Sequence, residues 1–366
     1  MRIYWIDNPQ TGGGHVRTTM PMQELVRRGH TCTLGYGQFN IDVGSWDLLV
    51  LGRLVQGGIL DALPALRGAG VKIVYDVDDA LDLLEPDNPS YVFLARNIEP
   101  YFRMLGSADL ITASTVEIAR HVSLFVPQGR PIVVLPNCVD ARAWPQRRGE
   151  NRVPRLGFAG GNSHLGDLCC VLEAVAELQR ADRAERFEFV VFGISSEHAS
   201  FEEYYADCSA RVMRTLHPIF GETLTRVREL LAGIRHTWVR GVPVADFARR
   251  LSEVNLDLGL CPLRASHFNR FKSCLKAYEY AMVGTEALCS CSRPYTDELP
   301  PGVFPLVPHN AAAWHDAIQA WLSDPSGRRD RTAAQRAWVL QNRTIETRSH
   351  LWEEAFRPLL RGRAGG

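Results

Sequence analysis

The chain has 366 residues, of which 46% are hydrophobic and 22% charged, a composition typical of a soluble globular protein with about two domains. Lys and Arg together number 41, as do Asp and Glu, so the net charge is zero. This balance disfavours a protein that binds mainly by neutralising a nucleic-acid backbone, but it is compatible with a local basic patch.

The nine cysteines show no paired Cys-x2-Cys spacing of a zinc site, and a chain of this size does not need disulfide bonds for stability. The start, MRIYWID, is too short and too soon charged for a signal peptide. No apolar run reaches the ~20 residues of a membrane span. These features predict a reduced, cytoplasmic protein with no transmembrane segment.

The first half of the sequence alternates short apolar runs with helical periods. Helices are predicted at residues 16–28 and 59–67. Strands are predicted at residues 2–6, 31–34, 48–51, 72–75, 110–112 and 132–135. This alternation implies right-handed crossovers and a parallel, doubly wound sheet. The polar, Arg- and Pro-rich segment 144–154 predicts the end of a first domain, residues 1–150.

The second half repeats the alternation, so we expect an α/β protein with two doubly wound, Rossmann-like domains. The second domain is predicted to span residues 151–335. Segment 195–235 is mostly helical in period and longer than a crossover requires. The predicted strands are 156–159, 187–192 and 256–260, and the predicted helices are 167–179, 272–283, 314–322 and 333–360.

Both predicted domains carry glycines where the first strand leads into a helix, at Gly12–Gly14 and at Gly160 and Gly161. Bare amides and the positive end of a helix favour an anionic group at such a turn. Neither segment has the spacing of a dinucleotide fingerprint or a Walker loop. Each could be a simple tight turn, but two at equivalent places predict a ligand in the cleft between the domains.

Only three of the 41 basic residues are lysines, and two of these, Lys272 and Lys276, lie at the start of one predicted helix. Cations at a helix N-terminus oppose its dipole. An anion shared by the lysines and the amides of residues 273–275 would remove the conflict. The alternative is a surface helix with a weak Lys276–Glu279 pair. The scarcity of lysine favours the anion site, because Arg does not replace a compact ammonium group there.

Segment 268–284, FNRFKSCLKAYEYAMVG, resembles the donor-binding signature of retaining glycosyltransferases of the GT-B fold, and more narrowly the Asn-x-x-Lys-Ser-x-x-Lys-x-x-Glu-Tyr pattern of family 4. The resemblance extends over nearly the whole chain. It also includes segments 12–17, 74–79, 108–115, 135–140 and 156–164, together with Asp167 and residues 287–290.

This resemblance implies the fold, the reaction and the substrates. The first domain would bind the acceptor and the second the donor, with a C-terminal helix, residues 336–366, packing back on the first domain. The enzyme would move a sugar from a nucleotide-diphosphate sugar, foremost a UDP-sugar, to a hydroxyl, with retention and with no metal or other cofactor. The acceptor stays open among glycans, lipid-linked or small-molecule hydroxyls and modified DNA, and so does the oligomeric state.

The resemblance also implies the roles of single residues. Lys272 would neutralise the diphosphate in catalysis with Lys276 as a helper, and Glu279 would accept hydrogen bonds from the donor ribose. Asp78 and His164 are further catalytic candidates. The other donor contacts would be Gly13, Gly14, Gly161, Asn162 and the amides of Ser273, Cys274 and Leu275, and the acceptor contacts His15, Asp78 and Asp79.

Two departures from the family pattern affect these roles. The family often carries Glu-x7-Glu with Glu279 as its second member, but the first position is Phe271 in this chain. Relatives often place Arg and Lys after the first strand of the donor domain, where this chain has Gly161, Asn162 and His164. The diphosphate charge is therefore left mainly to Lys272 and Lys276.

Several alternatives stay open. Asp76-Val77-Asp78 matches the Asp-x-Asp metal motif of another glycosyltransferase fold, although two doubly wound domains disfavour that interpretation, and the cluster could also be solvated loop charge. His15 and His164 could be structural.

The function of the chain also has alternatives. The chain could be a non-catalytic sugar-nucleotide binder, an epimerase, or a glycosyltransferase for hydroxymethylated DNA bases. For DNA, segment 195–235 and four arginines, Arg328, Arg329, Arg331 and Arg336, could form a basic patch; the arginines could equally be a solvated helix start.

Overall fold

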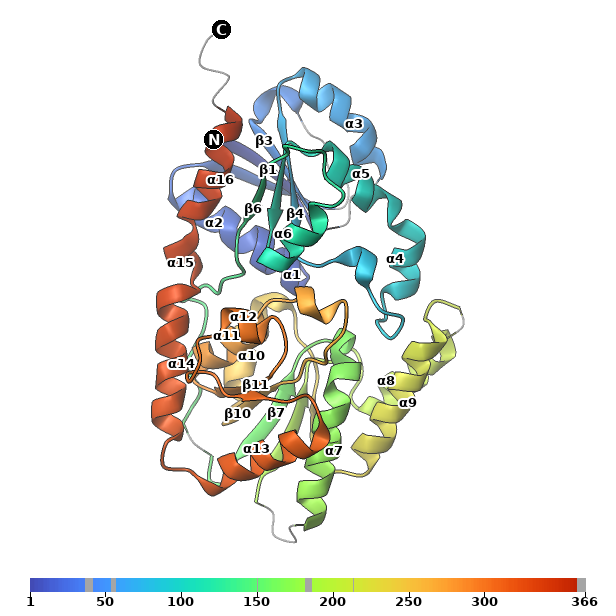
Figure 1. Ribbon diagram of the computed structural model, residues 1–366, viewed down its shortest axis with the longest axis vertical. Coiled ribbons are helices and arrows are strands. Elements are labelled where there is room, and N and C mark those ends of the chain that lie inside the picture. Colours follow the sequence, from blue (N-terminus) through green and yellow to red (C-terminus); the bar gives the residue numbers. More distant parts are fainter. Residues whose placement is uncertain (37–41, 54–56, 150, 182–185, 213, 361–366) are drawn as a thin grey trace.

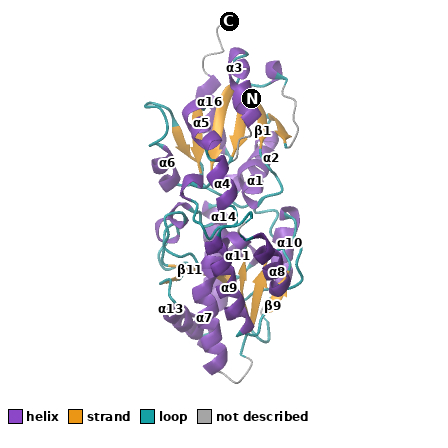
Figure 2. Cartoon of the chain, turned by 90° about the vertical axis from the view of Figure 1, so that its right-hand side faces the viewer, coloured by secondary structure: helices purple, strands orange, loops and turns teal. Residues whose placement is uncertain are grey.

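The computed structural model describes residues 1–36, 42–53, 57–149, 151–181, 186–212 and 214–360. These residues form two α/β domains stacked along the long axis of the molecule (Figure 1), with a parallel sheet at the centre of each (Figure 2). The predicted fold class of two doubly wound, Rossmann-like domains is therefore confirmed.

The first sheet has the order β2-β1-β3-β4-β5-β6, with all neighbouring strands parallel. Its strands are β1 (Arg2–Ile6), β2 (Thr31–Gly35), β3 (Leu48–Gly52), β4 (Lys72–Val77), β5 (Leu110–Ala113) and β6 (Ile132–Val134). The second sheet has the order β12-β11-β10-β7-β8-β9 and is also parallel. Its strands are β7 (Arg155–Ala159), β8 (Glu188–Phe192), β9 (Thr237–Val239), β10 (Leu258–Cys261), β11 (Glu286–Ser290) and β12 (Leu306–Val307).

Helices cover both faces of the first sheet, because its central strands are apolar on both sides. On one face pack α3 (Gly57–Gly68), α5 (Glu99–Ser107) and α6 (Val116–Val122). On the other pack α2 (Met20–Arg27) and, from the end of the chain, α16 (His350–Leu360). α4 (Tyr91–Asn97) lies beside the second domain (Figure 1).

The second sheet is covered in the same way. One face carries α7 (Leu165–Ala181), α8 (Phe201–Arg211), α9 (Pro218–Ala232) and α13 (Ala311–Ser323). The other carries α10 (Val244–Val254), α11 (Leu275–Val283), the short α12 (Tyr295–Glu298) and α14 (Arg328–Asn342). The predicted insertion 195–235 supplies α8 and α9, and His217 between them contacts Tyr91 of α4, with ring centroids 5.4 Å apart.

The prediction of one continuous helix over residues 333–360 is wrong. The structure has three helices there, α14, α15 (Ile345–Arg348) and α16. At the first break, Val139 of the interdomain linker donates to the carbonyl of Arg343, and Ile345 donates to the carbonyl of Val139, both at 2.9 Å. This backbone pairing is incompatible with a continuous helix. The return to the first domain is confirmed: Trp352 lies 5.5 Å from Trp5 between ring centroids.

Other differences lie at element ends and in short strands. Gly12–Gly14 is not a loop but the first turn of a helix, α1, which continues through a π-helical turn (His15–Thr19) into α2. Helix α11 begins at Leu275 rather than at Lys272. The short strands β9, β11 and β12 and helix α10 were not predicted. Among the described residues no helix combines the length and apolar character needed to cross a bilayer.

Candidate functional site

The carboxyl ends of both sheets face one another across a cleft that contains a cavity of about 350 Å³. The first domain contributes Gly12 and His15 to its lining, and the second contributes Gly161, Leu275 and Glu279. The fold thus brings together predicted site residues that are up to 267 positions apart in sequence, from Gly12 to Glu279. One wall is apolar and consists mainly of Trp144, Val242 and Phe247.

Helix α11 presents its N-terminus to this cleft. Cys274 is its N-cap, but no side chain caps the helix. Within the described part of the chain no group accepts a hydrogen bond from the amides of Ser273, Cys274 or Leu275. Unpaired amides at the positive end of a helix attract an anion. The Cys274 thiol is fully buried, and burial raises its pKa well above the ordinary value, so the group is not an anionic nucleophile at neutral pH.

Lys276 reaches from α11 to the end of the first strand of its own domain. Its ammonium group donates to the carbonyl of Ala159 at 2.5 Å and lies 4.6 Å from the ring centroid of Phe158. A side chain at Gly160 would fall against this ammonium, which explains the glycine. Burial lowers the pKa of Lys276 below its ordinary value. Lys276 therefore contributes a fixed, partly desolvated cation at the donor-side glycines.

Glu279 lies one turn further along α11 and lines the cavity. Burial raises the pKa of its carboxyl group to about 7, an effect that Lys276 only partly offsets. No described residue donates a hydrogen bond to this carboxylate. A partly buried carboxylate without a donor is a strong acceptor for paired hydroxyl groups of a ligand.

Lys272 crosses the cleft. Its ammonium group lies 2.9 Å from Asp79 Oδ1 of the first domain and 4.4 Å from the ring centroid of Phe268. Both members of the ion pair are 20% exposed. The structure thus places a predicted donor residue in contact with a predicted acceptor residue, and an anion arriving at Lys272 would compete with Asp79.

Arg53 is a charged residue of the cleft that the sequence analysis missed. It follows β3 with a φ of 42°, a strained value for a side chain other than glycine, and donates to Asp78 Oδ2 from Nη2 at 2.5 Å. Burial alone would raise the pKa of Asp78, but Arg53 outweighs it and holds this pKa below the ordinary value. A side chain at Gly13 would fall on the Arg53 guanidinium. Arg53 belongs to no sequence motif, so the only signal in the sequence was its position directly after a predicted strand.

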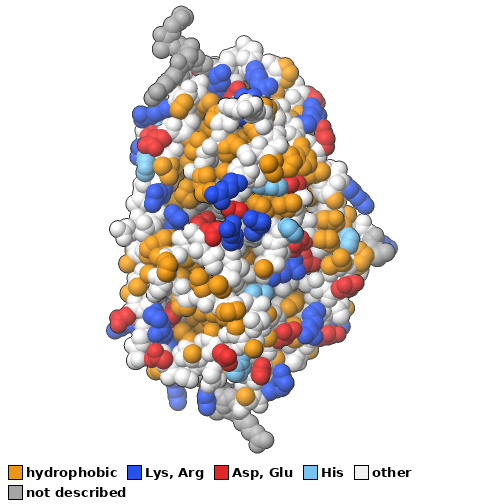
Figure 3. Space-filling view, viewed as in Figure 1, with side chains coloured by type: hydrophobic (Ala, Val, Ile, Leu, Met, Phe, Trp, Pro, Cys, Tyr) orange, Lys and Arg blue, Asp and Glu red, His pale blue; other side chains and the backbone are white. Residues whose placement is uncertain are grey.

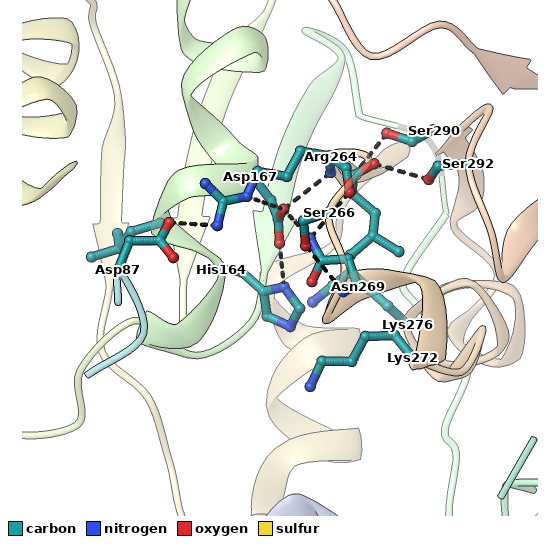
Figure 4. Close-up of polar contacts among 12 residues, drawn as sticks. Asp87, His164, Asp167, Arg264, Ser266, Asn269, Lys272, Lys276, Ser290 and Ser292 are labelled. Carbon is teal, nitrogen blue, oxygen red and sulfur yellow. Dashed lines mark hydrogen bonds and ion pairs between the residues drawn. The ribbon is translucent and has the colours of Figure 1, made fainter. Parts of the chain in front are cut away.

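His164 belongs to a buried polar network around Asp167 (Figure 4). His164 Nδ1 lies 2.8 Å from Asp167 Oδ2, and Asp167 Oδ1 accepts from Asn269 at 2.7 Å and from the Arg264 amide at 3.1 Å. Burial lowers the pKa of His164 despite this carboxylate, so the ring is neutral at pH 7. The network fixes which ring nitrogen faces Asp167 and leaves Nε2 for a ligand.

The other predicted residues lie near the cavity but do not line it. Gly14 is buried against the carbonyl of Asn8, which leaves no room for a side chain. Asn162 lies in the short helical turn that leads into α7. Of the acidic cluster, Asp76 accepts from Arg17 at 2.6 and 2.9 Å, and Arg17 is only 2% exposed. Among the described residues no three metal-binding side chains converge.

Phe271 occupies the position of the missing first glutamate. It is 7% exposed and packs into the apolar core of the first domain, 5.1 Å from His121 between ring centroids. His121 in turn lies 2.8 Å from Asp82. Position 271 therefore joins the two domains instead of supplying a carboxylate to the cleft.

Two doubly wound domains, a cleft between the carboxyl ends of their sheets, and a C-terminal helix returned to the first domain define the GT-B fold. Solved structures with this fold resemble the whole chain. Sucrose-phosphate synthase from Thermosynechococcus elongatus has a TM-score of 0.70 at 12% identity over 99% of this chain and 100% of that chain.

Two further similar structures contain ligands. Anabaena HepE, in complex with UDP and glucose, has a TM-score of 0.65 at 12% identity over 98% of this chain and 100% of that one. An α-glucosyltransferase, in complex with UDP and a 13-mer DNA, has a TM-score of 0.61 at 13% identity over 98% and 99%. No protein-family model and no curated protein sequence matches the chain.

Proposed function

We propose that this protein is a glycosyltransferase that moves a sugar from a UDP-sugar to an acceptor hydroxyl, with retention and without a metal ion. The observation that carries the proposal is the pairing of two sites on one helix. The uncapped N-terminus of α11, with Lys272 and Lys276, suits a diphosphate. One turn away, the carboxylate of Glu279 accepts no hydrogen bond from a described residue and suits ribose hydroxyls. The UDP complexes of the similar structures support this assignment.

In the proposed reaction, cleavage of the sugar–phosphate bond places negative charge on the leaving UDP. The unpaired amides of residues 273–275 and the ammonium of Lys272 would stabilise this charge as it develops. The donor releases Lys272 from Asp79. The acceptor hydroxyl attacks the face from which UDP departs, and its proton passes to the leaving phosphate, so retention needs no nucleophile from the protein.

The acceptor side is proposed to lie on the first domain. Asp78, held by Arg53, and Asp79, once released from Lys272, begin the loop after β4. His15 lines the cavity, and burial lowers the pKa of its ring, which is therefore a neutral hydrogen-bonding group at pH 7. Carboxylates and a neutral imidazole are suited to accepting hydrogen bonds from sugar-like hydroxyls.

The test is a turnover assay that follows the release of UDP from a set of UDP-sugars, with and without hydroxyl acceptors. UDP and one UDP-sugar should stabilise the protein against heat, by about 2.7 kcal/mol at 100 times the dissociation constant. Acceptor-dependent release of UDP should follow. Stabilisation without release would instead identify a non-catalytic binder, and interconversion of the sugar without any acceptor would identify an epimerase.

The lysines provide a matched pair for this assay. Lys272→Ala should lower the turnover number by ~100-fold or more, because the lysine interacts most strongly with the charge that develops on the diphosphate. Lys72→Ala is the control, since Lys72 begins β4 at the sheet edge opposite the cleft. Equal turnover of both variants would show that the diphosphate binds elsewhere.

The likeness to an α-glucosyltransferase crystallised with DNA makes a DNA base a second candidate acceptor. The four arginines of α14 do not favour it. They lie near the amino-terminal edge of the second sheet, and one of them, Arg331, is paired with the buried carboxylate of Glu286 at 2.7 Å. A DNA acceptor would make activity fall steeply as salt is added, whereas activity on a neutral acceptor would change little.

A further inference from the structure

A second cavity, of about 780 Å³, lies outside the cleft. It is lined by α14, by the loop after α13 and by the interdomain linker. Asp257, the residue before β10, lines it, whereas Gly161, just beyond the end of β7, lines the cleft. The two cavities therefore lie at opposite edges of the second sheet, and a ligand of the cleft does not extend into the second one.

The sequence of α14 creates this hollow. Arg328, Arg329 and Arg336 project from one face of the helix, and the short side chains of Thr332 and Ala333 lie between them. The long side chains form the rim and the short ones leave the space. Figure 3 shows basic and acidic side chains interspersed over much of the visible face.

The charges at this hollow are not balanced. Arg147, also in the lining, is neutralised by Asp257 at 2.6 Å. Arg328 stacks on Trp321, 3.7 Å from the ring centroid. Arg329 and Arg336 form no ion pair with any described acidic side chain, and Arg336 Nε is buried without an acceptor in the described part of the chain.

Two further features raise the positive potential. α14 has 15 residues, and no side chain caps its N-terminus at Gly327, so the positive end of its dipole is open beside the arginines. The nearby carboxylates of Glu286 and Asp324 are paired with Arg331, on the other side of the helix start. Asp330, in the first turn, offsets part of the potential but does not line the cavity.

We propose that this cavity binds a small, multiply phosphorylated anion. The planar forks of Arg329 and Arg336 can each hold phosphate oxygens through two parallel hydrogen bonds. The volume lies within the range of small-molecule sites, and the arginines converge on a hollow. A nucleic acid would instead require an extended basic surface along its backbone.

The position of the cavity connects it to the donor helix. In its linker wall, Gln146 donates to the carbonyl of Met282, and Arg147 donates to the carbonyl of Gly284 at 2.6 Å. Both acceptors lie at the C-terminal end of α11, whose N-terminus faces the cleft. An anion bound between the linker and α14 would therefore hold in place the linker residues that contact the C-terminal end of α11.

The experiment is a calorimetric titration of the full chain with inorganic tripolyphosphate while UDP saturates the cleft. Binding should persist under these conditions and should weaken by about tenfold or more in Arg329→Gln and in Arg336→Gln, the loss expected for a charge-assisted hydrogen bond. Arg329 is exposed, so its variant should fold normally even if Arg336→Gln does not. Arg249→Gln, on the exposed face of α10 and outside the cavity, is the matched control and should bind like the parent.

Absence of binding in the presence of UDP would overturn the proposal, as would equal affinity of the parent and the Arg329 variant. A duplex DNA oligonucleotide is titrated in parallel. If DNA binds through Arg329 and tripolyphosphate does not, the arginines belong to a nucleic-acid surface and the small-anion site is wrong. The thermal shift produced by UDP is measured on each variant, so a failure here is distinguished from a failure of the cleft assignment.

Discussion

The carboxylate of Glu279 is suited to bind a ligand, but its burial lowers the folding stability of the free protein. Its carboxylate faces the cavity without a donor, and burial raises its pKa to about 7. The folded protein therefore binds a proton there at pH values where the unfolded chain does not. Folding stability should fall as the pH rises from about 4.5 to 7, because ionisation is easier in the unfolded state.

Donor affinity should show the opposite dependence on pH. If ribose hydroxyls donate to the ionised carboxylate, as proposed, the affinity for UDP should decrease as the pH falls below about 7. Calorimetry from pH 5.5 to 8.5 measures this dependence. Glu279→Gln should bind UDP more weakly at pH 8, and its affinity should depend less on pH than that of the parent, because only the titration of the UDP phosphate remains. A parent protein whose affinity is flat over this range would contradict the assignment.

The same substitution should stabilise the free protein. Glu279→Gln removes a carboxylate that burial disfavours, so unfolding at pH 8 should require more free energy, by up to roughly 3 kcal/mol for the whole shift. Near pH 4.5 the two proteins should be alike. Denaturant titrations at the two pH values provide the comparison, and a less stable variant at pH 8 would show that a protein group satisfies the carboxylate.

Gly13 and Gly12 offer a second matched pair. A methyl group at Gly13 falls on the Arg53 guanidinium, whereas one at Gly12 meets open space. Gly13→Ala should displace Arg53 from Asp78 and leave a buried carboxylate poorly paired, at a cost of roughly 1–3 kcal/mol. Gly12→Ala should unfold at the same temperature as the parent. Equal melting of both variants would mean that Arg53 moves aside without loss.

In the segment between β10 and α11, the residue that replaces a motif glutamate has a structural role. Phe271 replaces the carboxylate of related patterns and is buried in the core of the other domain. Phe271→Glu should therefore not improve catalysis; it should destabilise the protein, because an unpaired carboxylate would be placed among apolar side chains. Phe271→Met, similar in volume, should cost less than about 1.5 kcal/mol. Thermal melting and turnover are the measurements, and higher turnover of the glutamate variant would refute this account.

The elements that the sequence predicted correctly are those with strong local signals. Apolar runs located nine of the twelve strands of the two described sheets, and helical periods located the main helices between them, which was enough to predict the doubly wound fold. The glycine segments and the segment around Lys272 indicated the cleft. Short strands such as β12, with two residues, carry no period to recognise. The break after Arg343 depends on pairing with Val139, which is 204 positions away, and local sequence does not encode it.

The site residues that belong to a sequence motif could be predicted. Those whose role depends on an ion pair with a residue distant in sequence could not. His15, Gly161 and Glu279 were expected at the cleft and line it. Arg53 and Arg17 were not singled out, because their roles arise from ion pairs with Asp78 and Asp76 that only the folded sheet creates. Their positions after β3 and before α2 are ordinary in sequence.

Across the whole molecule, ion pairs connect the two domains along one side of the cleft. Besides Lys272 and Asp79, Arg264 lies 2.7 Å from Glu85, and Arg270 lies 3.1 Å from Glu117. Partly exposed pairs of this kind contribute little free energy each, so they do not by themselves hold the two domains in one fixed arrangement. A donor that bridges both domains should favour the closed arrangement.

Small-angle scattering tests this closure. Saturating UDP should decrease the radius of gyration of the parent, and the decrease should be smaller in Lys272→Ala, which removes the proposed contact to the diphosphate. An unchanged radius in the parent would argue against a donor that bridges the domains. Lys72→Ala again serves as the control and should behave like the parent.

The return of α16 to the first domain also sets an order for folding during synthesis. The second domain is continuous in sequence, so all its strands have been made once β12 is complete. The first domain begins with β1, yet part of the apolar face around Trp5 is covered by Trp352 and Phe356 of α16. On the ribosome, where domains usually fold in the order in which they are translated, the domain begun first is here the last to be completed. The part of this face that α16 covers stays open until residue 356 has been added, and a nascent chain would need protection there.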